Sequence, residues 1–377
     1  MMKRKLNNNT NTVNGIRLLE ARKLAGLTSI AVGPLVGVSP QAISLYENCR
    51  SIPSFEVFEK LYTLYNLPYD FYFKPDTELT LDSPVYYRKL TRATKVKRDV
   101  SFIQAKLFIT EIVKELQKSV AFPQVDPLFW DIKKSFSIGK ESLDVEVMSR
   151  WIRKKWGLGY GPIENLTYEL EKRGVIIGFL DLPNDIDGFS FWSENRPYIF
   201  VSHNNNAFRL RMSLAHELCH LFFHGAEDLN QDFKRIESEA KNFASAFLLP
   251  GISFLNEVVS LSLQGLLSLK PRWKISVAGL LMRCKKLHLI DEDYALYLNK
   301  QISRRRWRKV EPLDDSIAPD KSVLMRQAIQ ILLDKNVYTA ESFKSVLALP
   351  QTFIESVCCL DSGMLDTKHT NLIQIFR

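Results

Sequence analysis

The sequence 213-SLAHELCHLFFHG-225 places His216 and His220 four residues apart, with Glu217 directly after the first histidine. Residues four apart on an α-helix lie on one face, so both imidazoles can bind the same zinc ion. Glu217 is rotated by ~100° from His216, too far for a third ligand but well placed to take a proton from an activated water molecule. A helix with buried or solvated histidines contains the same pattern, so the rest of the chain has to decide between these interpretations.

A third ligand is expected from the next helix, whose sequence is 235-RIESEAKNFASAFLLP-250. Glu237 and Glu239 are the candidates. Helical spacing puts Glu237 on the same face as an apolar stripe, whereas Glu239 is rotated by ~200° towards the other side. The stripe consists of Ala240, Phe243, Ala244 and Phe247. We therefore predict Glu237 as the third ligand, and an exposed charged residue is the alternative.

Two other side chains near the pair are expected to be structural. His224 lies eight residues after His216. This is ~12 Å along a straight helix, so one ion cannot bind both, and we expect His224 to cap the helix C-terminus. Cys219 is expected to pack in the interior, because zinc sites that use cysteine usually contain several.

Composition narrows the class of protein. The chain has 377 residues, enough for two or three domains, and its 46% hydrophobic and 25% charged residues indicate a globular protein. The net charge of +9 favours acidic partners such as nucleic acid, although a basic surface that binds nothing has the same charge. The sequence has no apolar run of the ~18 residues that a membrane span needs, and its odd set of cysteines lacks CxxC spacing. We expect a cytoplasmic protein without membrane association.

Hydrophobic periodicity predicts a mainly helical α+β fold with a small β-sheet. Apolar residues recur at helical spacing at 100–120, 144–156, 206–224, 235–249 and in several segments between 254 and 356. Short β-branched and aromatic runs at 173–182 and 197–202 predict strands. We expect the strand at 197–202 to offer an edge to which an extended substrate can add.

Several residues that precede His216 in the sequence have two possible roles. In 185-DIDGFSF-191, Asp187, Phe189 and Ser190 either shape the cleft or form a structural turn, and the turn is the favoured interpretation. Arg209 and Arg211 either stabilise an oxyanion or lie on a solvated helix face, and the solvated face is favoured.

The N-terminal part contains a turn between two short helices in 27-LTSIAVGPLVGVSPQAISLYE-47. Gly37 suits the turn, Ser39 an N-cap and Pro40 the first helical position. Residues 17–73 resemble a helix-turn-helix of the Cro/C1-repressor (XRE) type. Ile43 and Tyr46 should face its core. Short polar residues at the exposed start of the recognition helix can reach base edges in the major groove of DNA. The candidate DNA-binding residues are Ser39, Gln41, Ala42 and Ser44.

The second helix of this module departs from the usual alanine-rich pattern, because it contains Gly33 and Pro34. A proline inside a helix costs ~3 kcal/mol, so we expect this helix to be kinked or shortened. Residues 1–75 contain nine basic and five acidic residues, a net charge of +4 that permits contacts with DNA phosphates. An XRE-like fold that binds protein or dimerises is the alternative.

Further motifs follow along the chain. They are 85-VYYRKL-90, 153-RKKWGLGYGPIENL-166, 185-DIDGFSF-191, 209-RLRMSLAHELCHLFFH-224, 237-ESEAKNFASAFLLP-250, 270-KPRWKISVAGLLMRCKKLHLI-290 and 303-SRRRWRKVEP-312. Together they resemble the ImmA/IrrE-type metallopeptidase family, bacterial and phage regulators often fused to, or encoded beside, an XRE helix-turn-helix. The likeness covers about residues 14–312, and the joint occurrence of these motifs is far more specific than any one of them.

The resemblance implies a zincin-like domain in which zinc is held by His216, His220 and Glu237, with Glu217 as the base. It also implies that the protein cleaves or inactivates a partner repressor and thereby switches on stress, mobile-element or toxin-antitoxin genes.

Two positions depart from the family pattern. Cys219 stands where glycine is usual, and Lys241 stands where asparagine or aspartate normally follows the Glu-x-x-Ala motif. A cation at 241 repels zinc unless its side chain points outward, so we expect impaired catalysis if Lys241 faces the site.

The expected organisation has four parts. They are an XRE-type domain at 1–75, a linker and helical connector at 76–145, a metallopeptidase domain at 146–312 and a helical extension at 313–377. The extension should form two or three amphipathic helices at 322–360, a candidate partner or homodimer surface. The basic run at 304–309 either binds phosphate or is a solvated helix face.

Two functional hypotheses follow. The first is a DNA-associated regulator with a zinc-dependent endopeptidase domain that acts on a repressor or antitoxin. The alternative is a non-catalytic XRE-family transcriptional regulator that uses the peptidase fold as a sensor or interaction module. A peptidase whose helix-turn-helix holds its protein substrate is a third possibility, and it predicts no salt-dependent binding of DNA.

Overall fold

The computed structural model describes residues 12–83, 86–87, 95–135, 144–183, 186–224 and 229–366. The chain forms two compact units. The helical unit comprises Met1–Leu79, Ala93–Val120 and Ala328–Arg377, and the sheet unit comprises Thr80–Arg92 and Ala121–Gln327. The domain limits expected from the sequence stay predictions, and the motif at 85–90 lies mostly outside the described residues.

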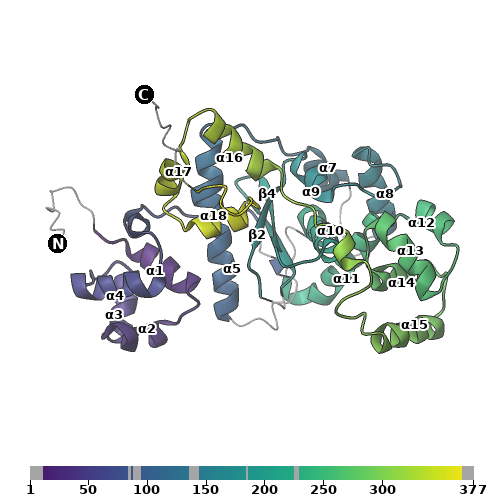
Figure 1. Ribbon diagram of the computed structural model, residues 1–377, viewed down its shortest axis with the longest axis horizontal. Coiled ribbons are helices and arrows are strands. Elements are labelled where there is room, and N and C mark those ends of the chain that lie inside the picture. Colours follow the sequence, from purple (N-terminus) through teal and green to yellow (C-terminus); the bar gives the residue numbers. More distant parts are fainter. Residues whose placement is uncertain are drawn as a thin grey trace, which may run out of the picture. The chain divides into compact units, whose positions relative to one another are not determined.

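Four short helices and a 3-10 turn form the N-terminal part of the helical unit (Figure 1). They are α1 (Gly15–Leu24), α2 (Ser29–Val36), α3 (Pro40–Glu47), α4 (Phe55–Tyr65) and η1 (Tyr69–Phe73). The N-terminus of each of the four α-helices is capped by an Asn, Ser or Thr side chain that accepts a backbone N–H. Ile43 is buried as expected, whereas Tyr46 is only half-buried.

The turn between α2 and α3 follows the sequence expectation. Gly37 has φ 81°, in the left-handed region that glycine tolerates best. The Ser39 hydroxyl accepts the Ala42 N–H at 3.1 Å, and Pro40 is the first residue of α3. Pro34 lies inside α2, which is a single helix of only eight residues. Gly33 lets α2 approach the turn, since a Cβ there would lie 2.8 Å from the Val38 carbonyl oxygen.

The rest of the helical unit comes from two distant parts of the chain. Its helices are α5 (Lys95–Leu107), the π-helical η2 (Phe108–Val113), α6 (Lys114–Gln117), most of α16 (Leu324–Asp334), α17 (Ala340–Leu347) and α18 (Gln351–Val357). The buried carboxylate of Glu111 accepts hydrogen bonds from Arg17 and Lys74. The same Lys74 ammonium donates to the carbonyl oxygens of Val346 and Leu347 at 2.9 and 3.0 Å. The sequence predicted two or three helices at 322–360, and the structure forms α16, α17 and α18 there. Lys74 connects the C-terminal end of α17 to Glu111 of η2, a carboxylate that Arg17 of α1 also binds.

The sheet unit contains a mixed sheet with the strand order β1-β3-β4-β2. The strands are β1 (Tyr86–Tyr87), β2 (Ile176–Leu180), β3 (Gly188–Ser193) and β4 (Arg196–Ser202). β2 pairs with β4 in parallel, whereas β3 is antiparallel to both β4 and β1. The mainly helical α+β class is therefore confirmed.

Two expectations about the sheet are wrong. The strand at 197–202 lies between β3 and β2, so both of its edges are paired and it cannot receive a substrate strand. The segment interpreted as a turn instead forms β3 from Gly188 onwards. The reason is its alternation: Phe189 and Phe191 stack with Phe200 on one face, while Ser190 and Trp192 bond to a helix on the other.

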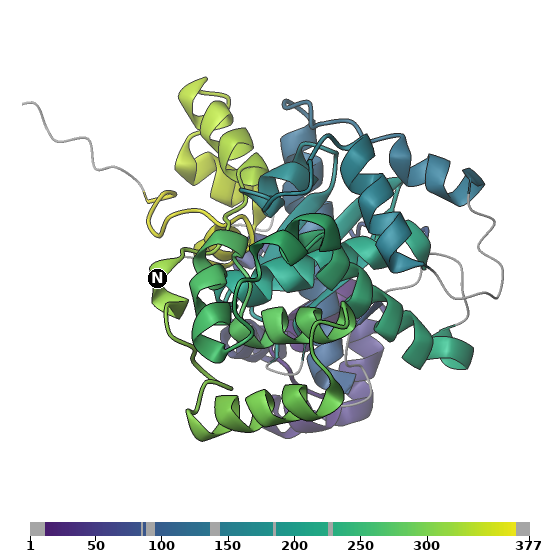
Figure 2. The same cartoon turned by 90° about the vertical axis from the view of Figure 1, so that its right-hand side faces the viewer.

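Helices surround this sheet within the same unit. They are α7 (Leu128–Ser135), α8 (Val145–Lys155), α9 (Leu166–Glu171), α10 (Ala207–Phe223), α11 (Leu229–Leu248), α12 (Gly251–Glu257), α13 (Leu263–Trp273), α14 (Val277–Lys286) and α15 (Glu292–Arg304), followed by the 3-10 turn η3 (Asp314–Ser316). Figure 1 shows α10 beside β4 with α11 next to it. The green helices α13, α14 and α15 pack in sequence on the side turned to the viewer in Figure 2.

Two buried arginines hold the C-terminal end of α11. Arg153 on α8 donates to the Phe247 carbonyl oxygen at 2.6 Å, and Arg283 on α14 donates to the Leu249 carbonyl oxygen at 2.8 Å. Carbonyls in the last turn of a helix lack intrahelical partners and attract cations. Burial lowers the pKa of Arg153 to about 10, so it remains a cation at neutral pH. These contacts fix the helix that carries Glu237.

Within the described ranges, no single helix is long and apolar enough to cross a membrane. Only α2 and α3 taken together meet the length and composition criteria, and they are bent by 107° at the turn between them.

Candidate metal centre

Helix α10 carries the histidine pair through the interior of the sheet unit. It begins after Asn206, whose side chain accepts the Arg209 N–H at 2.9 Å, and it ends at His224. The Phe222 ring stacks on Phe129 of α7 at a centroid distance of 4.4 Å, and the Trp192 indole donates to the Leu221 carbonyl oxygen. Contacts on both sides of α10 therefore fix its rotation, which decides where its histidines point.

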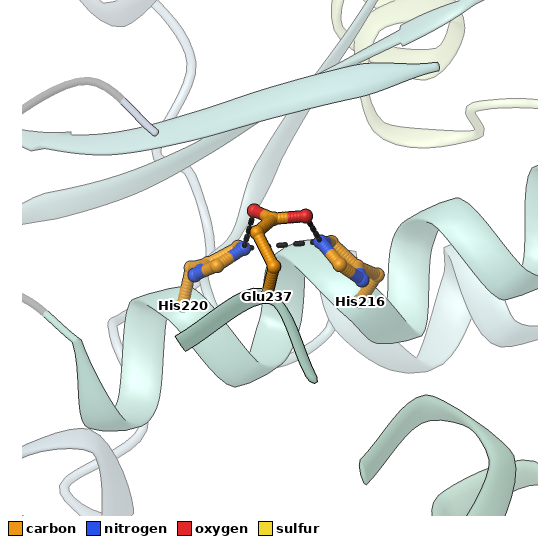
Figure 3. A group of neighbouring side chains, drawn as sticks. All are labelled: His216, His220 and Glu237. Carbon is orange, nitrogen blue, oxygen red and sulfur yellow. Dashed lines mark hydrogen bonds and ion pairs between the residues drawn. The ribbon is translucent and has the colours of Figure 1, made fainter. Parts of the chain in front are cut away.

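The structure brings His216, His220 and Glu237 together (Figure 3). The Nε2 atoms of the two histidines are 3.1 Å apart, and the Glu237 carboxylate lies 3.6 Å from His216 Nε2 and 3.5 Å from His220 Nε2. One nitrogen or oxygen from each residue lies within 4.8 Å of the others. Both histidines are buried and Glu237 is half-buried. The three side chains thus converge on one point.

The electrostatics of this cluster suit a cation. Burial, together with the neighbouring His216 and His224, lowers the pKa of His220 to about 3 although its hydrogen bond with Glu237 acts in the other direction, so the imidazole is neutral at physiological pH. Burial by itself raises the pKa of Glu237, but hydrogen bonds with His216 and His220 outweigh it and bring the pKa to about 2. A neutral His220 imidazole beside an ionised carboxylate is in the protonation state that metal binding requires.

The donor set also fits zinc. Two imidazoles and one carboxylate are ligands that zinc accepts, and catalytic zinc sites commonly use three protein ligands with a fourth position for water. Here His216 and His220 on α10 and Glu237 on α11 supply three ligands. Calcium and magnesium prefer oxygen ligands, so the two nitrogens argue against them.

Glu217 points from α10 towards β3. The Ser190 hydroxyl donates to the Glu217 carboxylate oxygen Oε2 at 2.8 Å. Two strand positions earlier, a Cβ on Gly188 would lie 3.5 Å from the Glu217 side chain and 2.9 Å from the Phe200 carbonyl oxygen. Glycine at this position therefore lets β3 lie close to the Phe200 carbonyl of β4, and Ser190 orients the Glu217 carboxylate.

The two arginines that flank the histidines are both engaged in ion pairs. Arg211 is buried, and it donates to Asp320 at 3.0 Å and to the Ile163 carbonyl oxygen. The expectation of a solvated face is therefore wrong for Arg211, because Asp320 compensates its charge in the interior. Arg209 is half-exposed and pairs with Asp187.

The two departures from the family pattern lie away from the ligand atoms. The Lys241 side chain is exposed, so its ammonium is directed to solvent instead of the cluster. Cys219 is completely buried, and burial raises the pKa of its thiol well above the usual value. A neutral thiol packs like a small apolar group, and Cys219 is not among the three residues whose ligand atoms converge.

His224 and Glu239 extend the cluster in a way that the sequence did not predict. His224 is the C-cap residue of α10, as expected. Its ring also connects His220 to Glu239, with Nδ1 2.9 Å from His220 Nδ1 and Nε2 3.2 Å from Glu239 Oε2. The helical wheel had assigned Glu239 to the other side of α11, but the carboxylate is buried against α10.

The candidate DNA-binding residues lie together at the start of α3. Ser39, Gln41 and Ser44 are exposed, whereas Ala42 is half-buried. These positions agree with a helix whose N-terminal turn faces a partner. DNA contact by these four residues stays a prediction.

Comparison with protein families gives two matches. Residues 170–285 match the IrrE N-terminal-like domain of the peptidase class, a range that contains β2 to β4, α10 and α11. The protein carries an IrrE N-terminal-like domain. Residues 18–72 match a helix-turn-helix family. The combination of a helix-turn-helix with an IrrE-like domain, expected from the sequence, is therefore confirmed. No curated protein matches the sequence significantly.

The IrrE-like domain contains three residues whose contacts at the site were not predicted from the sequence. They are Ser190, His224 as a partner of His220, and Glu239. A signal for Ser190 existed, because alternation along 188–193 isolates one serine on the face opposite two phenylalanines. No comparable signal identifies Glu239, since its burial depends on how α11 packs against α10.

Proposed function

We propose that the protein is a DNA-associated regulator whose IrrE-like domain is a zinc-dependent endopeptidase. In this proposal His216, His220 and Glu237 hold the zinc ion, and Glu217 is the general base. The observation that carries it is the convergence of the three ligand atoms within 4.8 Å on two packed helices. The family match supports a metallopeptidase-like domain, and the identity of the metal belongs to the proposal.

The chain's own residues then perform a peptide hydrolysis. His216, His220 and Glu237 would hold a zinc ion, which would supply Lewis-acid chemistry that brings the pKa of water near neutrality. Glu217, oriented by Ser190, takes a proton from the attacking water as the water oxygen bonds to the peptide carbonyl carbon. The same carboxyl then gives this proton to the leaving nitrogen as the C–N bond breaks. Two fragments result, one with a new carboxylate and one with a new amine.

The proposed substrate is a protein that represses transcription or acts as an antitoxin. The helix-turn-helix match supports association with DNA, which would bring the chain close to a repressor bound there. Loss of that repressor would switch on the genes it controls.

Metal removal tests this proposal. The purified protein is incubated with candidate repressors or antitoxins, beginning with any that a neighbouring gene encodes, and fragments are identified by mass spectrometry. We expect cleavage that stops after zinc is stripped with 1,10-phenanthroline and returns when one equivalent of zinc is added. Magnesium should not restore cleavage, because the cluster offers nitrogen ligands. Cleavage that continues without metal would contradict the proposal.

A second candidate function is favoured by the surface around the turn. Ile30, Leu35 and Leu45 on α2 and α3 are 72%, 62% and 43% exposed. Apolar side chains gain little from phosphates, so this surface also suits a protein partner. In that case the helix-turn-helix holds a protein and does not bind DNA.

DNA binding measured at several salt concentrations distinguishes the two. If α3 reads DNA, affinity for a selected operator falls steeply with salt. Gln41→Ala should then weaken specific binding by ~1–3 kcal/mol and leave non-specific binding unchanged. Gln264→Ala, an exposed glutamine on α13, is the matched control. No salt-dependent binding to any fragment would favour the protein-binding role.

A further inference from the structure

A row of buried polar side chains continues from the histidine pair away from Glu237. His220 Nδ1 lies 2.9 Å from His224 Nδ1, and His224 Nε2 lies 3.2 Å from Glu239 Oε2. The other Glu239 oxygen, Oε1, accepts a hydrogen bond from Arg235 at 2.9 Å. The side chains of His220 and His224 are 1% and 2% exposed. Water therefore has little access to either ring, and the contacts between the two rings and with Glu239 give these nitrogens hydrogen-bond partners inside the protein.

The carboxylate at one end of this row determines where the protons lie. An ionised carboxylate only accepts hydrogen bonds, so His224 must carry a proton on Nε2. When the proton on Nε2 is the only one on the His224 ring, Nδ1 has a lone pair and accepts a hydrogen bond from the His220 Nδ1–H. His220 in turn is left with a lone pair on Nε2, the atom that faces His216 and Glu237.

The reversed arrangement is unfavourable. If His220 carried its proton on Nε2, His224 would donate from Nδ1 and present a lone pair to the Glu239 carboxylate. Two acceptors would then face each other in the interior, where an unmatched polar contact is costly. Arg235 adds a positive charge on the far side of Glu239 and so supports its acceptor role.

We propose that His224 and Glu239 are positioning residues that set the tautomer of His220 and aim its Nε2 lone pair at the metal position. This inference rests on the proposed metal site, but it concerns residues outside the ligand set. Partners of this kind typically change metal affinity by 10–100-fold when they are removed.

Zinc affinity of the full-length protein tests the proposal, measured by competition with a chromophoric chelator. Glu239→Gln keeps the shape of the side chain, but the amide can donate as well as accept a hydrogen bond. The residue at position 239 then no longer determines which nitrogens of His224 and His220 carry the protons. His224→Phe keeps a ring without nitrogen. We expect each change to weaken zinc binding by ~10–100-fold. The double variant should be no weaker than the worse single variant, because both act through His220 Nδ1.

Rescue and control variants separate positioning from general stability. His224→Asn offers an amide oxygen close to the place of Nδ1, so it should recover much of the affinity that His224→Phe loses. Asp320→Asn breaks the buried pair with Arg211 on the same helix, away from the ligands. The zinc affinity of this variant should stay within about twofold of the wild type. This change is much smaller than the ~10–100-fold expected when a hydrogen-bond partner of a metal ligand is removed. Cobalt absorption spectra of the same variants report whether the ligand geometry has changed.

The outcomes distinguish this inference from the proposed function. A wild-type protein that binds no zinc overturns the metal site itself, and the positioning role with it. Zinc binding by the wild type that stays within about twofold in Glu239→Gln and His224→Phe overturns only the positioning role. An equal loss of affinity in Asp320→Asn also overturns it, because the effect would then reflect a weakened α10.

Discussion

His216→Ala is expected to reduce zinc affinity by more than the ~100-fold that marks the upper range for outer-shell partners, because it removes one of three direct ligands. The remaining donors, His220 and Glu237, would leave an ion two protein ligands instead of the usual three. Wild-type protein should retain close to one equivalent of zinc after gel filtration, and the variant should retain almost none.

Thermal unfolding provides a second measure of the same effect. A ligand that binds only the folded state adds about 2.7 kcal/mol of stability at 100 times its dissociation constant. Added zinc should therefore raise the melting temperature of the wild type but not of His216→Ala. His203→Ala, which removes an exposed histidine, is the control and should behave like the wild type. Equal zinc content in His216→Ala and the wild type would refute the ligand assignment.

Glu217→Gln is expected to slow cleavage of the partner by ~10²–10⁴-fold, the contribution typical of general acid and base groups. The amide oxygen of glutamine can still accept the Ser190 hydroxyl, so the fold and the metal should be retained. Co-expression with the neighbouring repressor or antitoxin provides the measurement. The partner should disappear with the wild type and persist with Glu217→Gln.

Zinc analysis of Glu217→Gln excludes a trivial loss of metal. Glu164→Gln alters a carboxylate that is 93% exposed and lies outside the cluster, so it serves as the control for loss of a negative charge. Retained zinc with lost cleavage would assign the base role to Glu217. Undiminished cleavage by Glu217→Gln would rule that role out, whatever its metal content.

The candidate ligands could be predicted from the sequence because their geometry is local. His216 and His220 lie one turn apart on a helix, and the apolar stripe of α11 places Glu237 on the packed face. The short helices of the N-terminal module were predictable for a similar reason, since Ser39 and Gly37 act within a few residues of their own positions.

Other features depend on contacts between distant segments. Arg211 looks like a surface residue until Asp320, 109 residues away, compensates it in the interior. Glu239 lies on a part of α11 that a helical wheel assigns to the outside, but His224 covers it. Asp187 and Gly188 in the segment 185–191 favour a turn by local propensity, but the alternation that follows places β3 at Gly188–Ser193. Local propensity cannot supply this information.

Strand β1 places Tyr86 opposite Ser190, and Ser190 bonds to Glu217. A polypeptide that adds to a sheet needs an edge with unpaired N–H and C=O groups. At this position the protein's own backbone already takes that place. A substrate strand that pairs with β3 beside Glu217 must therefore displace Tyr86 and Tyr87. Substrate binding at this edge would thus compete with the pairing of β1.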